Sequence, residues 1–145
     1  MKKIAIAADH AGYELKEFLV GYLSSMDYDV HDFGCHSPES CDYPDTGHPL
    51  AAAVARGEFE RGISVCGSGV GISIVVNRHA GVRGALSWAP EIAELGRRHN
   101  DANVLCLPAR FMDNATACRT VDVFLDTSFE GGRHQCRVAK IDSGA

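Results

Sequence analysis

The amino-acid sequence predicts an α/β protein, a three-layer α/β/α sandwich around a five-stranded parallel sheet. Five short runs rich in Val, Ile, Ala and Leu are typical of strands buried on both faces. They cover Lys3–Ala8, Tyr28–Phe33, Gly62–Cys66, Val82–Leu86 and Asn103–Leu107. Longer helical patterns separate these runs. Strands that alternate with helices pair in parallel through right-handed crossovers, so the sandwich follows from the order of the elements.

The helices are predicted from apolar spacing. In Gly12–Met26 the apolar residues recur three and four positions apart, which places them on one helix face. Four further helices are expected over Gly47–Arg56, Val70–Arg78, Ala89–Arg98 and Asn114–Leu125. The chain contains no internal repeat, low-complexity tract or linker-like stretch. We therefore expect residues 1–145 to form a single domain, since typical domains have roughly 100–150 residues.

Two segments interrupt the alternation of strands and helices. The polar stretch His31–His48 is long for a connection in a compact domain, and such loops often carry function. The C-terminal tail, residues 126–145, is too polar around Glu130–Arg137 to be core. We expect this tail to extend across a surface, either that of its own chain or that of a partner subunit.

Composition and charge exclude several classes of protein. The net charge of −5 argues against a nucleic-acid-binding surface. No apolar run approaches the roughly 20 residues of a membrane-spanning helix. The N-terminus runs directly into a strand pattern and leaves no room for a signal peptide, so a cytoplasmic protein is expected. The six cysteines are dispersed without a C-x-x-C pair and are interpreted as free, mostly buried thiols.

Unusual residues follow two of the predicted strands. The first strand ends in Asp9-His10, and the third ends in Cys66, followed by the turn Gly67-Ser68-Gly69-Val70-Gly71. Ligands of parallel sheets bind beyond the carboxyl ends of the strands, where strand order reverses. If the order is flavodoxin-like, both motifs face one crevice.

The glycine-rich turn suits an anion, because its glycines expose the backbone and the following helix begins with unpaired N–H groups. The same helix end favours the thiolate form of Cys66. The turn is not a dinucleotide fingerprint, since its third glycine arrives one position early. It is not a cysteine phosphatase loop either, because Ile72 stands where that loop needs arginine. A buried cysteine before a purely structural turn remains an equal alternative.

Other polar residues allow two interpretations. His99 and Asn100 could supply a general acid and an amide donor, but cations at a helix C-terminus favour a structural role for this segment taken alone. Arg133 and Arg137 could bind a phosphate, or lie in a solvated tail. Cys35, His36 and Cys41 lack a second ligand pair at zinc spacing, so no metal is expected.

Taken together, these segments resemble the ribose-5-phosphate isomerase B family, which includes the galactose-6-phosphate isomerase subunits. The matching motifs span nearly the whole chain in the family's order. They are Asp9-His10-Ala11-Gly12, Asp42-Tyr43-Pro44-Asp45, Cys66 to Ser73, Arg98-His99-Asn100-Asp101-Ala102-Asn103 and Gly131-Gly132-Arg133-His134. The resemblance implies a Rossmann-like fold, a homodimer or tetramer with sites where two subunits meet, and no cofactor.

The resemblance also implies a role for each matching residue. Cys66 would be the catalytic base and His99 the acid that opens the furanose ring. The substrate-binding residues would be Asp9, His10 and Tyr43 around the sugar, Gly67, Ser68, Gly69, Val70 and Gly71 around the reacting oxygens, Asn100 on the sugar or its enediolate, and Arg110, Arg133 and Arg137 with His10 on the phosphate. Ser68 replaces a frequent threonine, and Leu107-Pro108-Ala109 replaces a glycine-containing turn, which affects the pose of Arg110.

The expected reaction interconverts D-ribose 5-phosphate and D-ribulose 5-phosphate through a cis-enediolate. Removal of a proton next to a carbonyl needs a close, partly ionised base and preorganised donors for the enediolate. Two alternatives stay open. One is isomerisation of a six-carbon phosphosugar such as allose or galactose 6-phosphate, and the other is a non-catalytic phosphosugar-binding protein.

Overall fold

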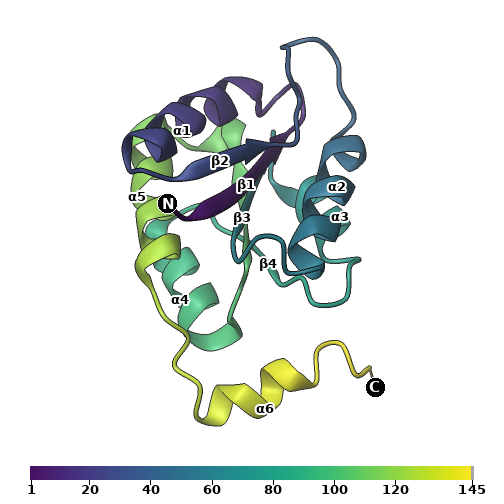
Figure 1. Cartoon of the computed structure of the whole chain (residues 1–145), viewed down its shortest axis with the longest axis vertical. Helices are drawn as coiled ribbons and strands as arrows, with labels where there is room; N and C mark the ends of the chain where they lie inside the picture. The colour runs from purple at the N-terminus through teal and green to yellow at the C-terminus, as the bar shows by residue number, and fades with distance from the viewer. Residues whose placement is uncertain (145) are drawn as a thin grey trace.

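The computed structural model describes residues 1–144 and contains a parallel sheet with helices on both of its faces (Figure 1). The strands are β1 (Lys3–Ala8), β2 (Asp29–Asp32), β3 (Gly62–Cys66), β4 (Gly84–Leu86) and β5 (Val104–Pro108). All pairings are parallel, and the order across the sheet is β2-β1-β3-β5-β4. This confirms the predicted α/β/α sandwich with a Rossmann-like sheet.

The strand order departs from the flavodoxin-like one at a single edge. β5 lies between β3 and β4, so β4 is the edge strand. β5 is buried along its whole length, whereas β4 has three residues that are each partly exposed. The longer apolar strand therefore takes the interior position, and the short strand takes the edge. The order still reverses between β1 and β3, where the crevice was expected.

Helices cover the two faces of the sheet in separate groups. The full set is α1 (Tyr13–Ser25), α2 (Tyr43–Ala55), α3 (Val70–Val76), α4 (Pro90–Asn100), α5 (Asn114–Asp126), α6 (Arg133–Ala139) and the short 3-10 helix η1 (Ala109–Phe111). On one face α1, α4 and α5 pack on residues such as Ile4 and Ile6 of β1. On the other face α2 and α3 pack on Ala5 and Ala7 of the same strand. Alternate residues of each strand thus face opposite layers, as the pleat requires.

The structure departs from the sequence prediction in two main respects. α2 begins at Tyr43 rather than at Gly47, because Pro44 occupies the first helical turn, where its missing N–H costs no hydrogen bond. The long connection therefore ends at Asp42 and leaves Tyr43 on a rigid helix. The tail also contains a helix that the sequence reasoning missed. α6 is entered through Gly131 and Gly132, both at positive φ.

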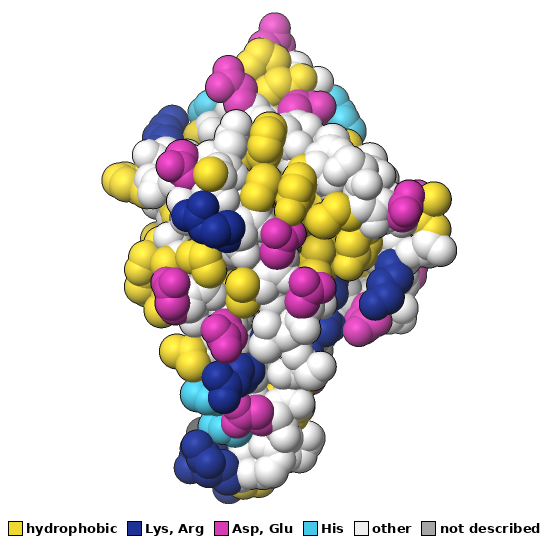
Figure 2. All heavy atoms as spheres, turned by 90° about the vertical axis from the view of Figure 1, so that its left-hand side faces the viewer, with side chains coloured by type: hydrophobic (Ala, Val, Ile, Leu, Met, Phe, Trp, Pro, Cys, Tyr) yellow, Lys and Arg dark blue, Asp and Glu magenta, His cyan; other side chains and the backbone are white. Residues whose placement is uncertain are grey.

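α6 lies apart from the sandwich, at the end of the molecule where α4 ends (Figure 1). Side chains of the Lys and Arg class and of His gather at this narrow end of the molecule (Figure 2). Ala145, the last residue of the predicted tail, lies outside the described residues. None of the helices within residues 1–144 is long and apolar enough to cross a membrane.

Candidate active site

A cavity of about 470 Å³ opens at the carboxyl ends of β1 and β3, where the strand order reverses. It collects most of the residues that the sequence singled out. The lining residues are Asp9, His10, Ala11, Cys41, Asp42, Tyr43, Cys66, Gly67, Ser68, Gly71, Arg110 and Phe111. We call this cavity the Cys66 pocket. Its position is the one that open parallel sheets use for ligands.

Asp9 holds the turn after β1 against β3. Its carboxylate accepts a hydrogen bond of 2.9 Å from the backbone N–H of Gly12, and its own N–H donates to the carbonyl of Val65 at 3.2 Å. Gly12 is needed here, because a Cβ at this position would lie 2.7 Å from the Val65 oxygen. The buried Asp9 is thus locked beside the end of β3, next to Cys66.

His10 and Tyr43 line the pocket beside the long loop and the glycine-rich turn. The Nδ1 atom of His10 lies 3.1 Å from both the carbonyl oxygen and the backbone nitrogen of Cys41, which anchors the end of the long loop. The ring of Tyr43 lies against the backbone at Gly71, where a Cβ would come within 2.8 Å of the ring. Gly71 therefore allows the tyrosine to sit directly on the turn.

Cys66 is the last residue of β3 and is 4% exposed. The turn that follows bends sharply because Gly69 adopts a left-handed φ of 75°. The Ser68 hydroxyl accepts a hydrogen bond of 3.3 Å from the N–H of Val70 at the start of α3. Cys66 therefore lines the pocket directly before the glycine-rich turn.

A second cysteine, Cys41, lines the same pocket. Burial, followed by a hydrogen bond with Cys35, raises the pKa of the Cys41 thiol to about 12. Cys41 is therefore protonated at neutral pH and cannot act as a base there. Cys66 is left as the cysteine of this pocket suited to proton transfer.

Arg110 completes the pocket from η1. Its backbone N–H donates to the carbonyl of Gly67 at 3.0 Å, and its guanidinium would lie 3.2 Å from a Cβ on that glycine. The unusual Leu107-Pro108-Ala109 segment thus still delivers Arg110 to the glycine-rich turn. An exposed guanidinium at this position can hold an anionic group of a ligand.

Of the remaining predicted residues, Gly69 and Val70 lie in the glycine-rich turn at the start of α3, and the other four lie elsewhere in the same chain. His99, Asn100, His134 and Arg137 line a separate hollow of about 330 Å³ beside α6. α4 ends at Asn100, just before β5 begins, so this hollow is at the amino end of the sheet, whereas Cys66 is at the carboxyl end. Arg133 is exposed on the first turn of α6. One copy of the chain therefore does not bring His99, Asn100, Arg133 and Arg137 to the Cys66 pocket.

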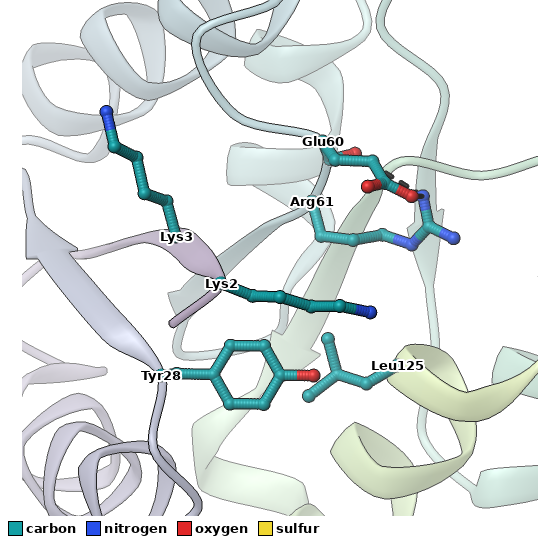
Figure 3. A pocket seen from close by; sticks show the side chains of 6 residues that line it. All are labelled: Lys2, Lys3, Tyr28, Glu60, Arg61 and Leu125. Atoms are coloured by element: carbon teal, nitrogen blue, oxygen red, sulfur yellow. Dashed lines mark hydrogen bonds and ion pairs between the residues drawn. The ribbon is translucent and has the colours of Figure 1, made fainter.

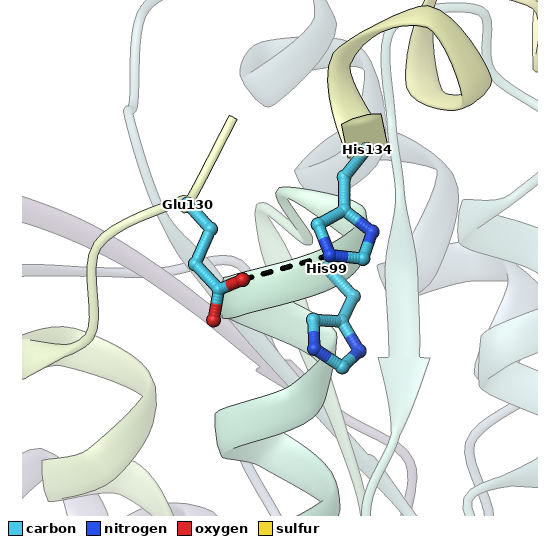
Figure 4. Close-up of side chains that lie close together, drawn as sticks. All are labelled: His99, Glu130 and His134. Carbon is cyan, nitrogen blue, oxygen red and sulfur yellow. Dashed lines mark ion pairs between the residues drawn. The ribbon is translucent and has the colours of Figure 1, made fainter. Parts of the chain in front are cut away.

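Around His99 the side chains form a compact cluster with Glu130 and His134 (Figure 4). The three residues offer ligand atoms within 4.8 Å of one another, a spacing from which a metal ion could be held. However, the two imidazole rings are stacked, with centroids 4.3 Å apart and planes 16° from parallel. Their in-plane lone pairs do not converge on one point, and Arg98 holds the Glu130 carboxylate at 2.6 Å. This arrangement suits ring stacking better than metal coordination.

A further hollow of about 270 Å³ lies at the amino ends of β1 and β3 (Figure 3). Lys2, Lys3, Tyr28, Glu60, Arg61 and Leu125 line it. Glu60 pairs with the Arg61 guanidinium at 3.3 Å. This hollow holds none of the motif residues and none of the predicted bases, so the Cys66 pocket is the candidate active site.

Sequence reasoning missed several residues of these two sites. Cys41 and Phe111 line the Cys66 pocket next to Tyr43 and Arg110. From the sequence, Cys41 was considered only as a zinc ligand, and Phe111 carries no sequence signal of its own. His134 lies in a quoted motif, yet nothing in the sequence indicated that its ring would meet His99.

Comparisons with known proteins agree with this geometry. Residues 4–141 match the family described as Ribose/Galactose Isomerase. Ribose-5-phosphate isomerase B of Escherichia coli (strain K12) is 45% identical over 141 residues, which cover 97% of this chain and 95% of that protein. The solved structure of a ribose 5-phosphate isomerase from Thermotoga maritima superposes with a TM-score of 0.97 at 46% identity, over 99% of each chain.

A second solved structure carries a ligand. It is ribose-5-phosphate isomerase B of Mycoplasma genitalium with bound ribulose-5-phosphate, with a TM-score of 0.92 and 40% identity over 96% of this chain and 93% of that one. These similarities extend over the Cys66 pocket and over α6 alike. The chain belongs to the ribose/galactose isomerase family.

Proposed function

We propose that this protein is an aldose–ketose isomerase that interconverts D-ribose 5-phosphate and D-ribulose 5-phosphate. The observation that carries the proposal is Cys66 at the start of the glycine-rich turn, in one pocket with Asp9, His10 and Tyr43. The relative with bound ribulose-5-phosphate supports a five-carbon phosphosugar as the ligand of this pocket.

The reaction requires an acid and a base. His99 gives a proton to the ring oxygen of the furanose while the bond from that oxygen to C1 breaks and the C1 hydroxyl releases its proton to water. The Cys66 thiolate then removes the proton from C2, and the electron pair forms the enediolate. The same proton then returns to C1 while the O2 hydroxyl gives up its proton and O1 takes one up, which yields the ketose, so atoms and electrons balance without an added reactant.

Stabilisation of the enediolate falls to the glycine-rich turn. Backbone N–H groups of the turn and the Ser68 hydroxyl can donate to the developing oxyanion, and they are held in place before the substrate arrives. Gly67, Gly69, Val70 and Gly71 are thus expected to contact the reacting oxygens through their backbone. Asn100 would supply a further donor.

The active site is proposed to need two copies of the chain. The Cys66 pocket has the base, and the hollow at α6 has His99 with Arg137. If the α6 end of a second copy covers the pocket, acid and base face one substrate, and Arg133 and Arg137 join Arg110 on its phosphate. The tail, residues 126–145, would then be a subunit contact in a homodimer or a dimer of dimers. The site is expected to work in the cytoplasm, as a step of pentose phosphate metabolism.

A coupled assay of ketose formation tests the proposal. Purified protein is offered ribose 5-phosphate, allose 6-phosphate and galactose 6-phosphate at equal concentrations. We expect the largest kcat/KM with the five-carbon substrate. A larger value with a six-carbon substrate would reassign the substrate. Binding of ribose 5-phosphate without turnover would indicate a phosphosugar-binding protein instead.

A further inference from the structure

The stacked pair of His99 and His134 has a geometry that the proposed mechanism does not yet use (Figure 4). The ring centroids are 4.3 Å apart, and the planes are 16° from parallel. His134 is 6% exposed, whereas His99 is half-buried and borders the hollow beside α6. One face of the His99 ring is therefore covered by the buried imidazole ring of His134.

The His134 ring is fixed relative to His99 because its segment is anchored to the end of α4. The Nε atom of Arg98 donates to the Glu130 carboxylate at 2.6 Å, and the backbone N–H of Glu130 donates to the carbonyl of Arg98 at 3.0 Å. The N–H of His134 then donates to the carbonyl of Gly131 at 3.0 Å in the first turn of α6. Arg98 and His99 are neighbours in the chain, so the anchor and the stacked ring belong to the same helix end.

Several elements contribute charged groups near His134. α4 contributes Arg98 and Glu94, the loop before α6 contributes Glu130, and α6 contributes Arg133 and Arg137. Burial, together with the charges of His99 and Arg133, lowers the pKa of His134. A neutral ring can lie against a protonated imidazole without repulsion, and its π face attracts the positive charge.

The Nε2 atom of His134 is poorly placed for a direct role. Its Nε2 atom is buried and has no hydrogen-bond partner among residues 1–144, and the Glu130 carboxylate oxygen is 3.6 Å away. The contribution of this side chain to the site is therefore the flat face that it presents to His99.

We propose that His134 is a positioning residue whose ring holds the His99 imidazole in the plane from which it protonates the sugar. The inference rests on the proposed role of His99 as the acid. A half-exposed histidine at a helix end would otherwise rotate freely about its ring torsion. Proton transfer depends strongly on alignment, and a misplacement of about 1 Å can cost a hundredfold in rate.

Two substitutions separate the flat face from the buried volume. His134→Leu fills the space without an aromatic face, whereas His134→Phe keeps a flat ring that cannot titrate. For the leucine variant we expect kcat to fall about 10- to 100-fold with KM changed less than about twofold. The phenylalanine variant is expected to stay within about threefold of the wild-type kcat. His134→Gln replaces the leucine variant if that protein does not fold.

NMR chemical shifts of the His99 ring protons test the stacking independently of enzyme activity. In the wild type and in His134→Phe, the carbon-bound ring protons of His99 lie above an aromatic face and are shifted upfield. In His134→Leu this shift is lost. Wild-type kcat in the leucine variant would overturn the proposal. Equal losses in the leucine and phenylalanine variants would also overturn it, because they would make the His134 nitrogens essential.

His99→Asn separates this inference from the proposed mechanism. If His99→Asn retains full kcat, the assignment of His99 as the acid fails, whatever the His134 variants do. If His99→Asn is inactive while His134→Leu is fully active, only the positioning role fails.

Discussion

The two ends of the sheet differ in what they offer a substrate. At the carboxyl end, the Cys66 pocket is formed by strand ends, a glycine turn and the first turn of α2, all joined by backbone packing. At the amino end, the hollow beside α6 is made by the end of α4 and a helix that stands apart from the sandwich (Figure 1). The first region has the proposed base without the proposed acid, and the second has the proposed acid without the proposed base. The comparison teaches that neither end is a complete active site, which is why a second copy is proposed.

The largest effect is expected from loss of the base. Cys66→Ala should reduce kcat by about a thousandfold or more, because the group proposed to remove the C2 proton is lost. KM should change little, since the binding groups remain. Steady-state kinetics check this, with Cys118→Ala in α5 as the matched cysteine control. Full activity of Cys66→Ala would contradict the role of Cys66 as the base.

Mixing two inactive variants tests whether the ends of two chains meet. Cys66→Ala and His99→Asn are each expected to be inactive. After they are unfolded and refolded together, about one quarter of wild-type activity should return, because half of the dimers are mixed and one site in each has both native residues. If acid and base came from the same chain, the mixture would stay inactive.

Loss of an α6 arginine should weaken binding more than chemistry. Arg137→Ala is expected to raise KM about 10- to 100-fold with a smaller change in kcat, because one charge-assisted contact to the phosphate is lost. Arg119 is exposed on α5, so Arg119→Ala is the control and should behave as the wild type. An unchanged KM would remove Arg137 from the proposed phosphate site.

A smaller effect on kinetics is expected from substitution of Gly71, at the carboxyl end of the sheet. Gly71→Ala places a Cβ within 2.8 Å of the Tyr43 ring and should displace it, raising KM by up to about tenfold. Gly21→Ala is the matched control. Nothing lies within 4 Å of its Cβ, and alanine should stabilise α1 by about 0.5–1 kcal/mol. Equal kinetics in both variants would show that the Tyr43 contact is dispensable.

The smallest predicted effect concerns acid stability at the α6 end. Folding lowers the pKa of His134 below its usual 6.5, mainly through burial. The unfolded chain then takes up this proton first, so the stability is complete above about pH 6.5 and falls as the pH drops toward the folded value. Thermal unfolding at pH 7 and pH 5 should show a larger decrease for the wild type than for His134→Phe. Equal decreases would mean that His134 does not titrate in this window.

The fold could be predicted from local patterns, and the exceptions have physical causes. Fully buried strands such as β3 and β5 are readable because their apolar runs are bounded by turns and helices. The edge position of β4 was not readable, because strand order depends on which strand buries more surface. α6 was missed because a short polar helix has no apolar stripe, and two glycines precede it.

The candidate site also contains some features that could be predicted from the sequence and others that could not. The sequence by itself determined which residue types stand at the strand ends, because Cys66, the glycine turn and Asp9 are local features of single turns. Only the tertiary structure decided that Tyr43 rests on Gly71, that Cys41 stays protonated, and that His99 stacks on His134 at the opposite end from Cys66. The physical reason is that these relations join residues far apart in the chain. Packing sets them, and no local pattern records packing.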